Sequence, residues 1–307
     1  MKVAFTLREM KWGIGEHTKN LLKYLGRLGV ESEFFVGNTS FGTNKLLLSA
    51  RLKDFDVIHV QGSPFGFFTI EIPKVTTVHT LLKREIKYDG KLSYLLGQAV
   101  EKRTLNTSDK IICVNPLMIR ELTNHYGVER SKIRYIPNGL DLEEFDGASL
   151  PREGFVLSCG RNIKRKRLAD IDVACKLLGL SHVNAGRDRF ISRKELLDLY
   201  KRASMYVCAS EYETGAITVM DAMASKCPVI CTNIPELLYY VDDGETALTF
   251  TPRNVEELTK KMRFLQDSSN LDLKDKIVKN AEGFVREYFD WKDLARETLS
   301  VYNELMK

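Results

Sequence analysis

A dense group of basic side chains follows a strand-like segment in the second half of the chain. Phe155–Ser158 runs through Gly160 into the segment Arg161–Arg167, which holds five cations in seven residues. Ligands of open α/β sheets bind at the carboxyl ends of strands, and several fixed cations there suit a diphosphate. A solvated basic loop is the alternative. We favour a diphosphate site because the cluster falls at the expected switch point of its domain.

Two acids accompany the next helical pattern. Glu213 comes just before Gly215 and Ala216, and residues 217–225 then have helical periodicity. A carboxylate beside the free amides of a helix N-terminus can bind hydroxyls and phosphate together. Asp221 follows Glu213 by eight residues, roughly two helical turns further on. Its alternative role is that of a satisfied polar residue beneath a loop.

Glycines begin the first helical pattern of the chain. Gly13 and Gly15 follow the strand-like segment Val3–Leu7 and precede an apolar stripe of leucines. Glycine lets a backbone approach a ligand closely, and a helix N-terminus offers amides to an anion. Glycine turns between strand and helix are also common without a ligand, so this signal is weak by itself.

The elements that would position these residues alternate between short strands and helices, which is typical of parallel sheets covered on both faces. The stretch Asn138–Glu153 interrupts the alternation and is predicted to be a linker. The expected strands are Val3–Leu7, Ser32–Val36, Val57–Val60, Val75–Val78, Ile111–Val114, Ile133–Ile136, Phe155–Ser158, Met205–Cys208, Val229–Cys231 and Ala247–Phe250. The expected helices begin near Glu16, Leu92 and Pro116 and, after the linker, cover Val255–Gln266, Leu273–Tyr288 and Trp291–Met306.

Composition excludes several classes of protein. The 307 residues are 44% apolar and 28% charged with a net charge of +5, which is ordinary for a globular chain. There is no apolar run of the roughly 20 residues that a membrane span needs, and no basic run interleaved with aromatics typical of nucleic-acid binding. The six cysteines form no C-x-x-C pair, which favours reduced thiols. The sequence predicts a cytoplasmic protein with no nucleic-acid partner.

Several motifs, taken in order, resemble those of retaining glycosyltransferases of family 4, and the resemblance extends over nearly the whole chain. The motifs are Gly13-Ile14-Gly15, His79, Ile136–Asp141 with Phe145, Gly160-Arg161 with Lys166, Ser210 with Glu213, Met220–Ala224 and Pro228–Ile230. The resemblance implies the α/β GT-B fold, in which two Rossmann-like parallel-sheet domains face each other across a cleft. It implies an acceptor-side domain of residues 1–147 with a crossover helix at 290–307, and a donor-binding domain of residues 148–289.

The resemblance also implies roles for individual residues. Arg161 and Lys166 would neutralise the diphosphate of a nucleotide-sugar donor, a large electrostatic contribution in such chemistry. Glu213 would lie beside the donor sugar and phosphates, with Gly215 and Ala216 in the same loop, and Asp221 would grip the ribose. Gly13 and Gly15 would contact the diphosphate from the other domain. His79 would orient a sugar hydroxyl or the acceptor, although a strand-end histidine can also be purely structural.

Some positions depart from the family pattern. Ala216 stands where glycine is usual, Asp221 replaces a glutamate and is one methylene shorter, and Arg167 replaces a glycine. The segment between Lys166 and Glu195 is also short, as if one strand–helix unit were missing. These departures bear on donor specificity more than on the class of reaction.

The residues leave other activities open or disfavour them. The Asp-x-Asp pairs Asp54/Asp56 and Asp170/Asp172 could hold a metal ion, but we interpret both as solvated, so no metal or other cofactor is expected. His59 and His125 are expected to be structural. The alternatives to a glycosyltransferase are a nucleotide-sugar epimerase and a catalytically silent nucleotide-sugar-binding subunit. An oxidoreductase is disfavoured because no complete G-x-G-x-x-G with a downstream acid occurs.

The acceptor is not defined by any motif, and a glycan or a lipid-linked sugar both fit. Basic residues of the first half leave open a peripheral contact with the inner face of the cell membrane. They are Lys19, Lys23 and Arg27 on the first helix and Lys83, Arg84, Lys87 and Lys91 after His79. The alternative is an ordinary solvated basic stripe.

Overall fold

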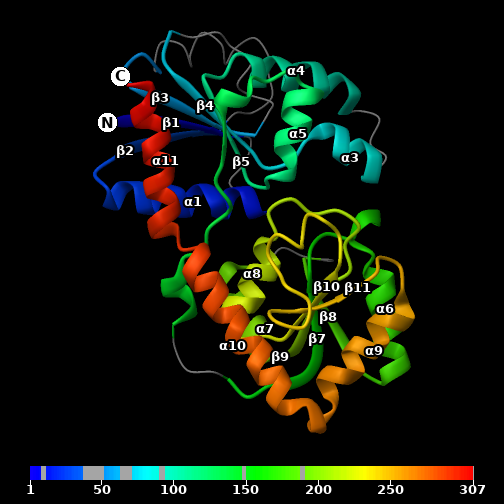
Figure 1. Cartoon of the computed structure of the whole chain (residues 1–307). Coiled ribbons are helices and arrows are strands. Elements are labelled where there is room, and N and C mark those ends of the chain that lie inside the picture. Colours follow the sequence, from blue (N-terminus) through cyan, green and yellow to red (C-terminus); the bar gives the residue numbers. More distant parts are fainter. Residues whose placement is uncertain are drawn as a thin grey trace. The chain divides into compact units, whose positions relative to one another are not determined.

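The structure is a computed structural model that describes residues 1–7, 12–36, 52–62, 71–89, 94–146, 150–186 and 191–306. The chain forms two compact units (Figure 1). Unit 1 comprises Met1–Gly139 and Trp291–Lys307, and unit 2 comprises Leu140–Asp290. No helix among the described residues is both long enough and apolar enough to span a membrane.

Unit 1 contains a six-stranded parallel sheet in the order β2-β1-β3-β4-β5-β6. The chain turns outward from β1 to β2 and then continues on the opposite side of β1 with β3, so the switch point lies between β1 and β3. The elements are β1 (Lys2–Leu7), α1 (Trp12–Arg27), β2 (Glu31–Val36), β3 (Val57–Gln61), β4 (Lys74–Val78), α3 (Leu82–Asp89), α4 (Tyr94–Asn106), β5 (Lys110–Cys113), α5 (Leu117–Asn124), the 3₁₀ turn η1 (Arg130–Lys132), β6 (Ile133–Tyr135) and α11 (Trp291–Leu305).

Alternating side chains of this sheet pack against helices on its two faces, as the pleat requires. Val3 and Phe5 of β1 contact the apolar stripe of α1 and the buried side of α11. Ile111 of β5 faces the other way, into a cluster with α4 and α5. Gly139 is needed beneath α11, because an added Cβ would lie 2.7 Å from the Trp291 ring. The last helix is thus part of the core of unit 1.

Unit 2 contains a five-stranded parallel sheet in the order β11-β10-β9-β7-β8. Its switch point lies between β7 and β9. The elements are η2 (Leu142–Phe145), β7 (Glu153–Cys159), η3 (Lys164–Lys166), α6 (Leu168–Leu178), β8 (Ser181–Ala185), α7 (Arg193–Arg202), β9 (Ala203–Cys208), α8 (Ile217–Ala224), β10 (Val229–Thr232), β11 (Leu248–Phe250), α9 (Val255–Gln266), η4 (Ser268–Asn270) and α10 (Leu271–Tyr288).

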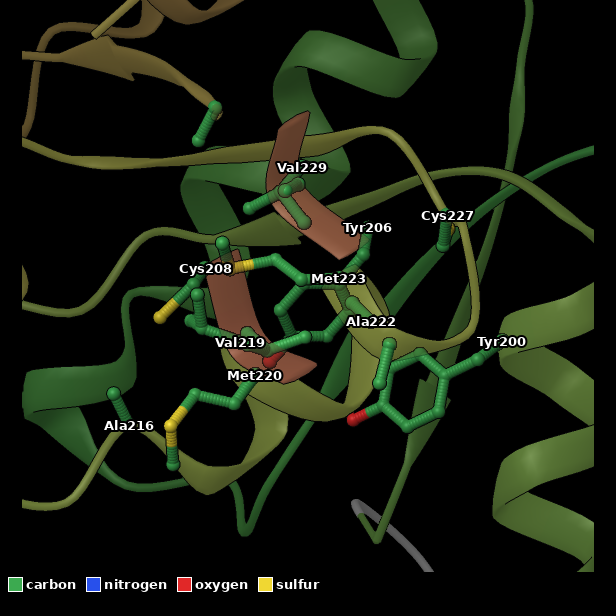
Figure 2. Close-up of a cluster of buried hydrophobic side chains, with 14 of the residues drawn as sticks. Tyr200, Tyr206, Cys208, Ala216, Val219, Met220, Ala222, Met223, Cys227 and Val229 are labelled. Carbon is green, nitrogen blue, oxygen red and sulfur yellow. The ribbon is translucent and has the colours of Figure 1, made fainter. Parts of the chain in front are cut away.

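The short helix α8 lies at the centre of the larger core of unit 2. Val219, Met220 and Met223 are completely buried there together with Tyr200 of α7 and Tyr206 of β9 (Figure 2). Helices α6 and α9 cover the opposite face of the sheet. A helix that is buried on all sides can be held rigidly at its N-terminus, where the candidate site residues lie.

The structure differs from the expectations in two places. Residues 140–146 of the segment predicted to be a linker pack as part of unit 2, because Leu140, Leu142 and Phe145 are buried in its core. The two units therefore divide between Gly139 and Leu140 instead of at residue 147. The pattern also missed α3, β8 and α7. Strand β8 is an edge strand with only one fully buried residue, Ala185, so it lacks the apolar run that marks the central strands.

Candidate functional site

The residues expected to bind a donor gather at the carboxyl ends of β7 and β9, at the switch point of unit 2. Gly160 follows β7 with a φ of 134°, and an added Cβ there would lie 3.2 Å from Lys166 Cε. Glu213 follows β9 by a loop that Thr232 anchors, since its hydroxyl donates to the Ser210 carbonyl at 2.6 Å. Strand ends at a switch point are where open α/β sheets bind ligands.

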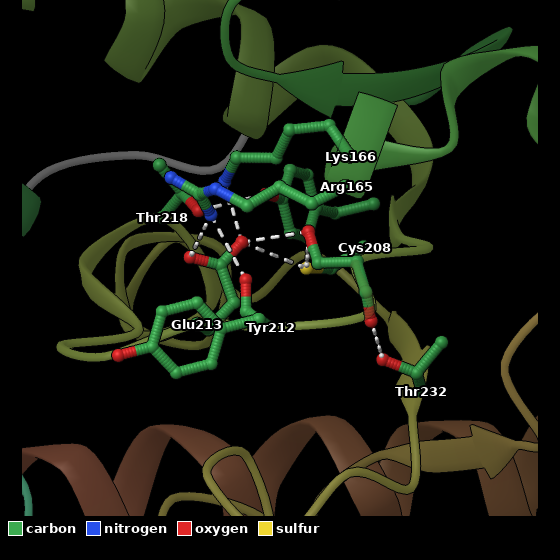
Figure 3. A network of polar contacts seen from close by, with 9 residues as sticks. Arg165, Lys166, Cys208, Tyr212, Glu213, Thr218 and Thr232 are labelled. Atoms are coloured by element: carbon green, nitrogen blue, oxygen red, sulfur yellow. Dashed lines mark hydrogen bonds and ion pairs between the residues drawn. The ribbon is translucent and has the colours of Figure 1, made fainter. Parts of the chain in front are cut away.

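Lys166 and Glu213 form a partly buried ion pair at this point (Figure 3). Both side chains are 14% exposed. The Ser210 hydroxyl also donates to Glu213 Oε1 at 2.7 Å, and Arg165 lies 3.8 Å from Oε2. Three side chains, those of Lys166, Ser210 and Arg165, thus contact the carboxylate of Glu213 at the end of the sheet.

Burial and ion pairing act in opposite directions on these two groups. Burial opposes the charged form of Lys166, but the Glu213 charge outweighs it and raises the pKa of Lys166 above its ordinary value. Burial likewise opposes ionisation of Glu213, but Lys166 and Arg165 lower the pKa of Glu213 below its ordinary value. Both groups are therefore charged at neutral pH.

The five cations predicted to act as one cluster divide into two sets. Arg165, Lys166 and Arg167 face acids of unit 2, and Arg165 also donates to the Tyr212 carbonyl at 2.9 Å. Arg161 and Lys164 are exposed, and their side chains form no hydrogen bond or ion pair within the described residues. The loop therefore carries two exposed charges, Arg161 and Lys164, whereas the charges of the other three cations are balanced by acids of unit 2.

Ala216 gives the start of α8 an unusual backbone. It has φ 44° and ψ 20°, in the left-handed region, and is 6% exposed. Glycine adopts this conformation without the steric penalty that a Cβ brings. Ala216, which stands where the family usually has glycine, therefore adopts a backbone conformation that favours glycine. Gly215 precedes Ala216 in the same turn.

Asp221 lies in a different environment from the one predicted for a residue that grips a ribose. Its side chain is 1% exposed, and both its oxygens accept hydrogen bonds from Arg193, at 2.5 Å and 2.9 Å. Arg193 Nε also donates to Glu144 at 2.9 Å. The expectation of a satisfied polar residue agrees with this geometry.

In unit 1, Gly13 and Gly15 lie in the first turn of α1, Gly13 exposed and Gly15 buried. His79 follows β4 and is 8% exposed. Its Nε2 lies 2.8 Å from Gln61 Oε1 at the end of β3. An amide oxygen only accepts, so Nε2 carries the proton and Nδ1 holds the lone pair. Burial, assisted by the neighbouring His17 and His59, lowers the pKa of His79 well below its ordinary value.

Two more buried histidines surround His79. The His17 ring lies edge-on to it at 4.6 Å between centroids, and His17 Nδ1 lies 2.9 Å from Asn138 Oδ1. His59 contacts Thr77 at 2.6 Å and Tyr302 at 2.5 Å. Burial is the main cause that lowers the pKa of His17 to about 4 and of His59 to about 3. The prediction of a structural role for His59 agrees with these contacts.

The Asp-x-Asp pairs differ from each other in burial. Asp54 and Asp56 are exposed, as predicted. The prediction was wrong for Asp170, which is 7% exposed and receives two 2.9 Å hydrogen bonds from Arg167. Asp172 pairs with His182 at 2.6 Å. No group of three or more His, Cys, Asp or Glu side chains within the described ranges is placed to hold a metal ion.

Sequence reasoning missed Arg193 and Gln61. Ser192 and Glu195 form a capping box that marks the start of α7, a signal readable from their spacing. Nothing in the sequence indicates that Arg193 reaches Asp221, 28 residues away. Gln61 ends a strand that the sequence predicts, but its contact with His79 depends on the pairing of β3 with β4.

Two solved structures show the same architecture over the whole chain. Sucrose-phosphate synthase from Thermosynechococcus elongatus superposes with a TM-score of 0.82 at 17% identity, covering 100% of this chain and 99% of that one. Anabaena HepE, solved in complex with UDP and glucose, gives 0.76 at 15% identity and covers 98% and 99%. Two parallel-sheet α/β domains of this kind define the GT-B class of glycosyltransferases.

Sequence comparison gives the family. Residues 37–144 match the family described as Glycosyltransferase Family 4, and residues 189–284 match Glycosyl transferases group 1. An MMP alpha-(1->4)-mannosyltransferase of Mycolicibacterium hassiacum is 24% identical over 84% of this chain and 72% of its own length. A Mycobacterium tuberculosis glycogen synthase is 26% identical over 76% and 63%. The chain belongs to glycosyltransferase family 4, whose members transfer a sugar from a nucleotide-sugar donor.

Proposed function

We propose that the chain is a retaining hexosyltransferase that moves a sugar from a nucleoside diphosphate sugar to an acceptor hydroxyl without a divalent metal ion. The observation that carries the proposal is the charged Lys166–Glu213 pair at the switch point of unit 2, with Arg161 exposed above it. Fixed cations aimed at a leaving diphosphate stabilise the charge that develops as the glycosidic bond breaks. UDP is the first nucleotide to test, because HepE binds it.

In this proposal the remaining residues orient the donor. Glu213 holds Lys166 in place and lies beside the sugar, and the turn of Gly215 and Ala216 directs the first amides of α8 toward the phosphates. In unit 1, the neutral His79 accepts a hydrogen bond from a sugar or acceptor hydroxyl through Nδ1. Gly13 and Gly15 let the start of α1 approach the diphosphate. The acceptor is a glycan or a lipid-linked sugar.

The experiment that tests the proposal measures turnover and donor affinity in Arg161→Ala and Lys166→Ala. Each change removes several kcal/mol of transition-state stabilisation, so we expect turnover to fall roughly 100-fold or more. Arg161 is exposed, so its variant tests the charge without disturbing the fold. Lys176→Ala, on the exposed side of α6, is the control and keeps wild-type turnover.

The same assay tests the other parts of the proposal. Preincubation with EDTA leaves turnover intact if the cations suffice, whereas a loss restored by Mg²⁺ or Mn²⁺ contradicts metal independence. Near-wild-type turnover in both cation variants would contradict the diphosphate assignment. Binding of nucleotide sugars with no transfer to any acceptor would favour the silent-subunit alternative.

A further inference from the structure

The carboxylate of Asp221 is enclosed by protein. Both of its oxygens accept from Arg193, and its side chain is only 1% exposed. Tyr200 of α7 is buried in the core around α8, and burial raises the pKa of Tyr200 well above its ordinary value, with smaller contributions from neighbours that include Asp221. A ligand hydroxyl could reach Asp221 only by displacing a guanidinium group.

Arg193, in contrast, is partly accessible, with its side chain 18% exposed. A guanidinium has five N–H groups, of which two donate to Asp221 and one to Glu144. Two N–H groups remain without a partner among the described residues. The group that a ligand meets above Asp221 is therefore a hydrogen-bond donor and not a carboxylate.

The position of Arg193 is locally unfavourable and is compensated by its neighbours. It is the first residue of α7, where the helix dipole disfavours a cation. Asp221 and Glu144 fix its guanidinium by hydrogen bonds, and Arg193 Cζ lies 5.5 Å from the centroid of the Phe145 ring. A cation at a helix N-terminus that two acids and an aromatic ring hold in place is typical of a functional position, because such positions often depart from local sequence preferences.

The location and charge of this group indicate which part of the donor it meets. Cys159, at the end of β7, packs against the core cluster that contains Val219 and Ala222 of α8, and the next residue, Gly160, lies against the Lys166 side chain. The Lys166–Glu213 pair and the group formed by Arg193, Asp221 and Glu144 therefore border the same strand end. With two carboxylates and one guanidinium, the Arg193 cluster has a formal charge of −1, which repels phosphate. It therefore suits an uncharged polar part of the donor beyond the diphosphate, the nucleoside.

We propose that Arg193 donates hydrogen bonds to the ribose hydroxyl oxygens of the donor, and that Asp221 and Glu144 are positioning residues that hold its guanidinium. The inference rests on the proposed function, because it assumes that unit 2 binds a nucleoside diphosphate. It reverses the direction of recognition implied by the family resemblance, in which the acid itself accepts from the ribose.

The test compares Asp221→Glu and Arg193→Lys by calorimetric titration of the full chain with UDP, GDP and their 2′-deoxy and 3′-deoxy forms. Lysine keeps the charge of Arg193 but loses its planar fork. Each variant should bind the preferred nucleotide about tenfold more weakly or worse, and the preference for the ribonucleotide should shrink toward one. Arg202→Lys, at the other end of α7 in a two-bond pair with Glu153, is the matched control and keeps wild-type binding.

Asp221→Glu separates the two directions of recognition. A ribose-binding acid regains reach from the extra methylene, so equal or tighter binding by this variant would overturn the proposal. If either single variant unfolds, the double variant Asp221→Asn/Arg193→Gln removes both charges of the pair together and leaves neutral amide side chains in their place. Wild-type affinity with wild-type preference in that variant would also overturn the proposal. Failure of the unaltered chain to bind any nucleoside diphosphate contradicts the proposed function instead.

Discussion

The carboxylate of Glu213 connects two segments of unit 2, the loop after β7 and the loop after β9. It receives a hydrogen bond from Ser210 at the end of β9, an ion pair from Lys166 in the loop after β7, and a longer contact from Arg165. A buried charge that loses its partner is strongly destabilising, so changes at either member of the pair alter folding as well as chemistry. Exposed Arg161 is for this reason the cleaner probe of the diphosphate.

Ala216 allows a prediction about stability at the scale of one residue. A Cβ in the left-handed region costs roughly 1–2 kcal/mol, and glycine avoids this cost at the expense of some unfolded-state entropy. We expect Ala216→Gly to raise the free energy of unfolding by up to about 1 kcal/mol, as measured by urea denaturation.

The control for this change is Ala222→Gly in the middle of α8. Glycine at a helical position is about 1 kcal/mol less favourable than alanine, so this variant should lose stability. A loss of stability in Ala216→Gly as large as that in the control would show that the strain at Ala216 is negligible.

At the scale of elements, α1 presents an exposed basic stripe. Lys19, Lys23 and Arg27 are exposed, while Leu21 and Leu25 of the same helix are buried in unit 1. The leucine face is therefore occupied by the core, and the basic side chains lie on the exposed face of the helix, where Lys19 pairs with Glu16 at 2.8 Å. Around His79 the second basic group is smaller than expected, because Arg84 pairs with Glu121 at 2.6 Å and Lys91 lies outside the described residues.

If the acceptor is lipid-linked, this stripe should hold the protein on an anionic surface. Each basic residue near such a surface contributes about 1 kcal/mol, and salt screens the attraction. We expect co-sedimentation with phosphatidylserine-containing vesicles at low salt and release at moderate salt. Changing Lys19, Lys23 and Arg27 to Gln should abolish binding.

A matched variant separates this stripe from net charge. Changing Lys274, Lys276 and Lys279 of α10 to Gln removes the same charge from unit 2 and should leave vesicle binding unchanged. Equal failure of the unaltered chain to bind neutral and anionic vesicles would contradict a membrane contact and favour a soluble glycan acceptor.

For the whole molecule, the buried histidines of unit 1 predict a dependence of stability on pH. His17, His59 and His79 all have a pKa below the ordinary 6.5, mainly because burial disfavours the charged ring. Below pH 6.5 the unfolded chain binds protons that the folded chain does not. The contribution of these histidines to the free energy of unfolding should therefore be constant above pH 6.5. Below pH 6.5 the free energy of unfolding should fall by up to about 1.4 kcal/mol per pH unit for each histidine.

Fluorescence can follow this change in unit 1 alone, because both tryptophans of the chain, Trp12 and Trp291, belong to it. Urea denaturation between pH 7.5 and 5 should show the decline. His59→Gln should make it shallower by about a third, since one of three such groups is removed, and His125→Gln, an exposed control, should not. A stability that does not change between pH 6.5 and 5 would contradict the neutral, buried state of these rings.

The sequence by itself determined the central strands and the class of the protein. Central strands such as Ile111–Val114 and Val229–Cys231 are predictable because a strand buried on both faces is apolar along its whole length, which is a local property. The family motifs are equally local, and the comparisons confirm the family and the GT-B fold that they predicted. Their spacing along βα units was sufficient to predict that the candidate site residues lie at strand ends.

Only the tertiary structure decided how the site residues are partnered. It divided the cationic loop into a paired and an exposed set, enclosed Asp221 with Arg193, and joined Gln61 to His79. It also packed Phe145 of the expected linker into a core. Each outcome depends on contacts between residues far apart in the chain, where burial and the nearest opposite charge decide the state of a polar group. Such pairs leave no periodic signal in a single sequence.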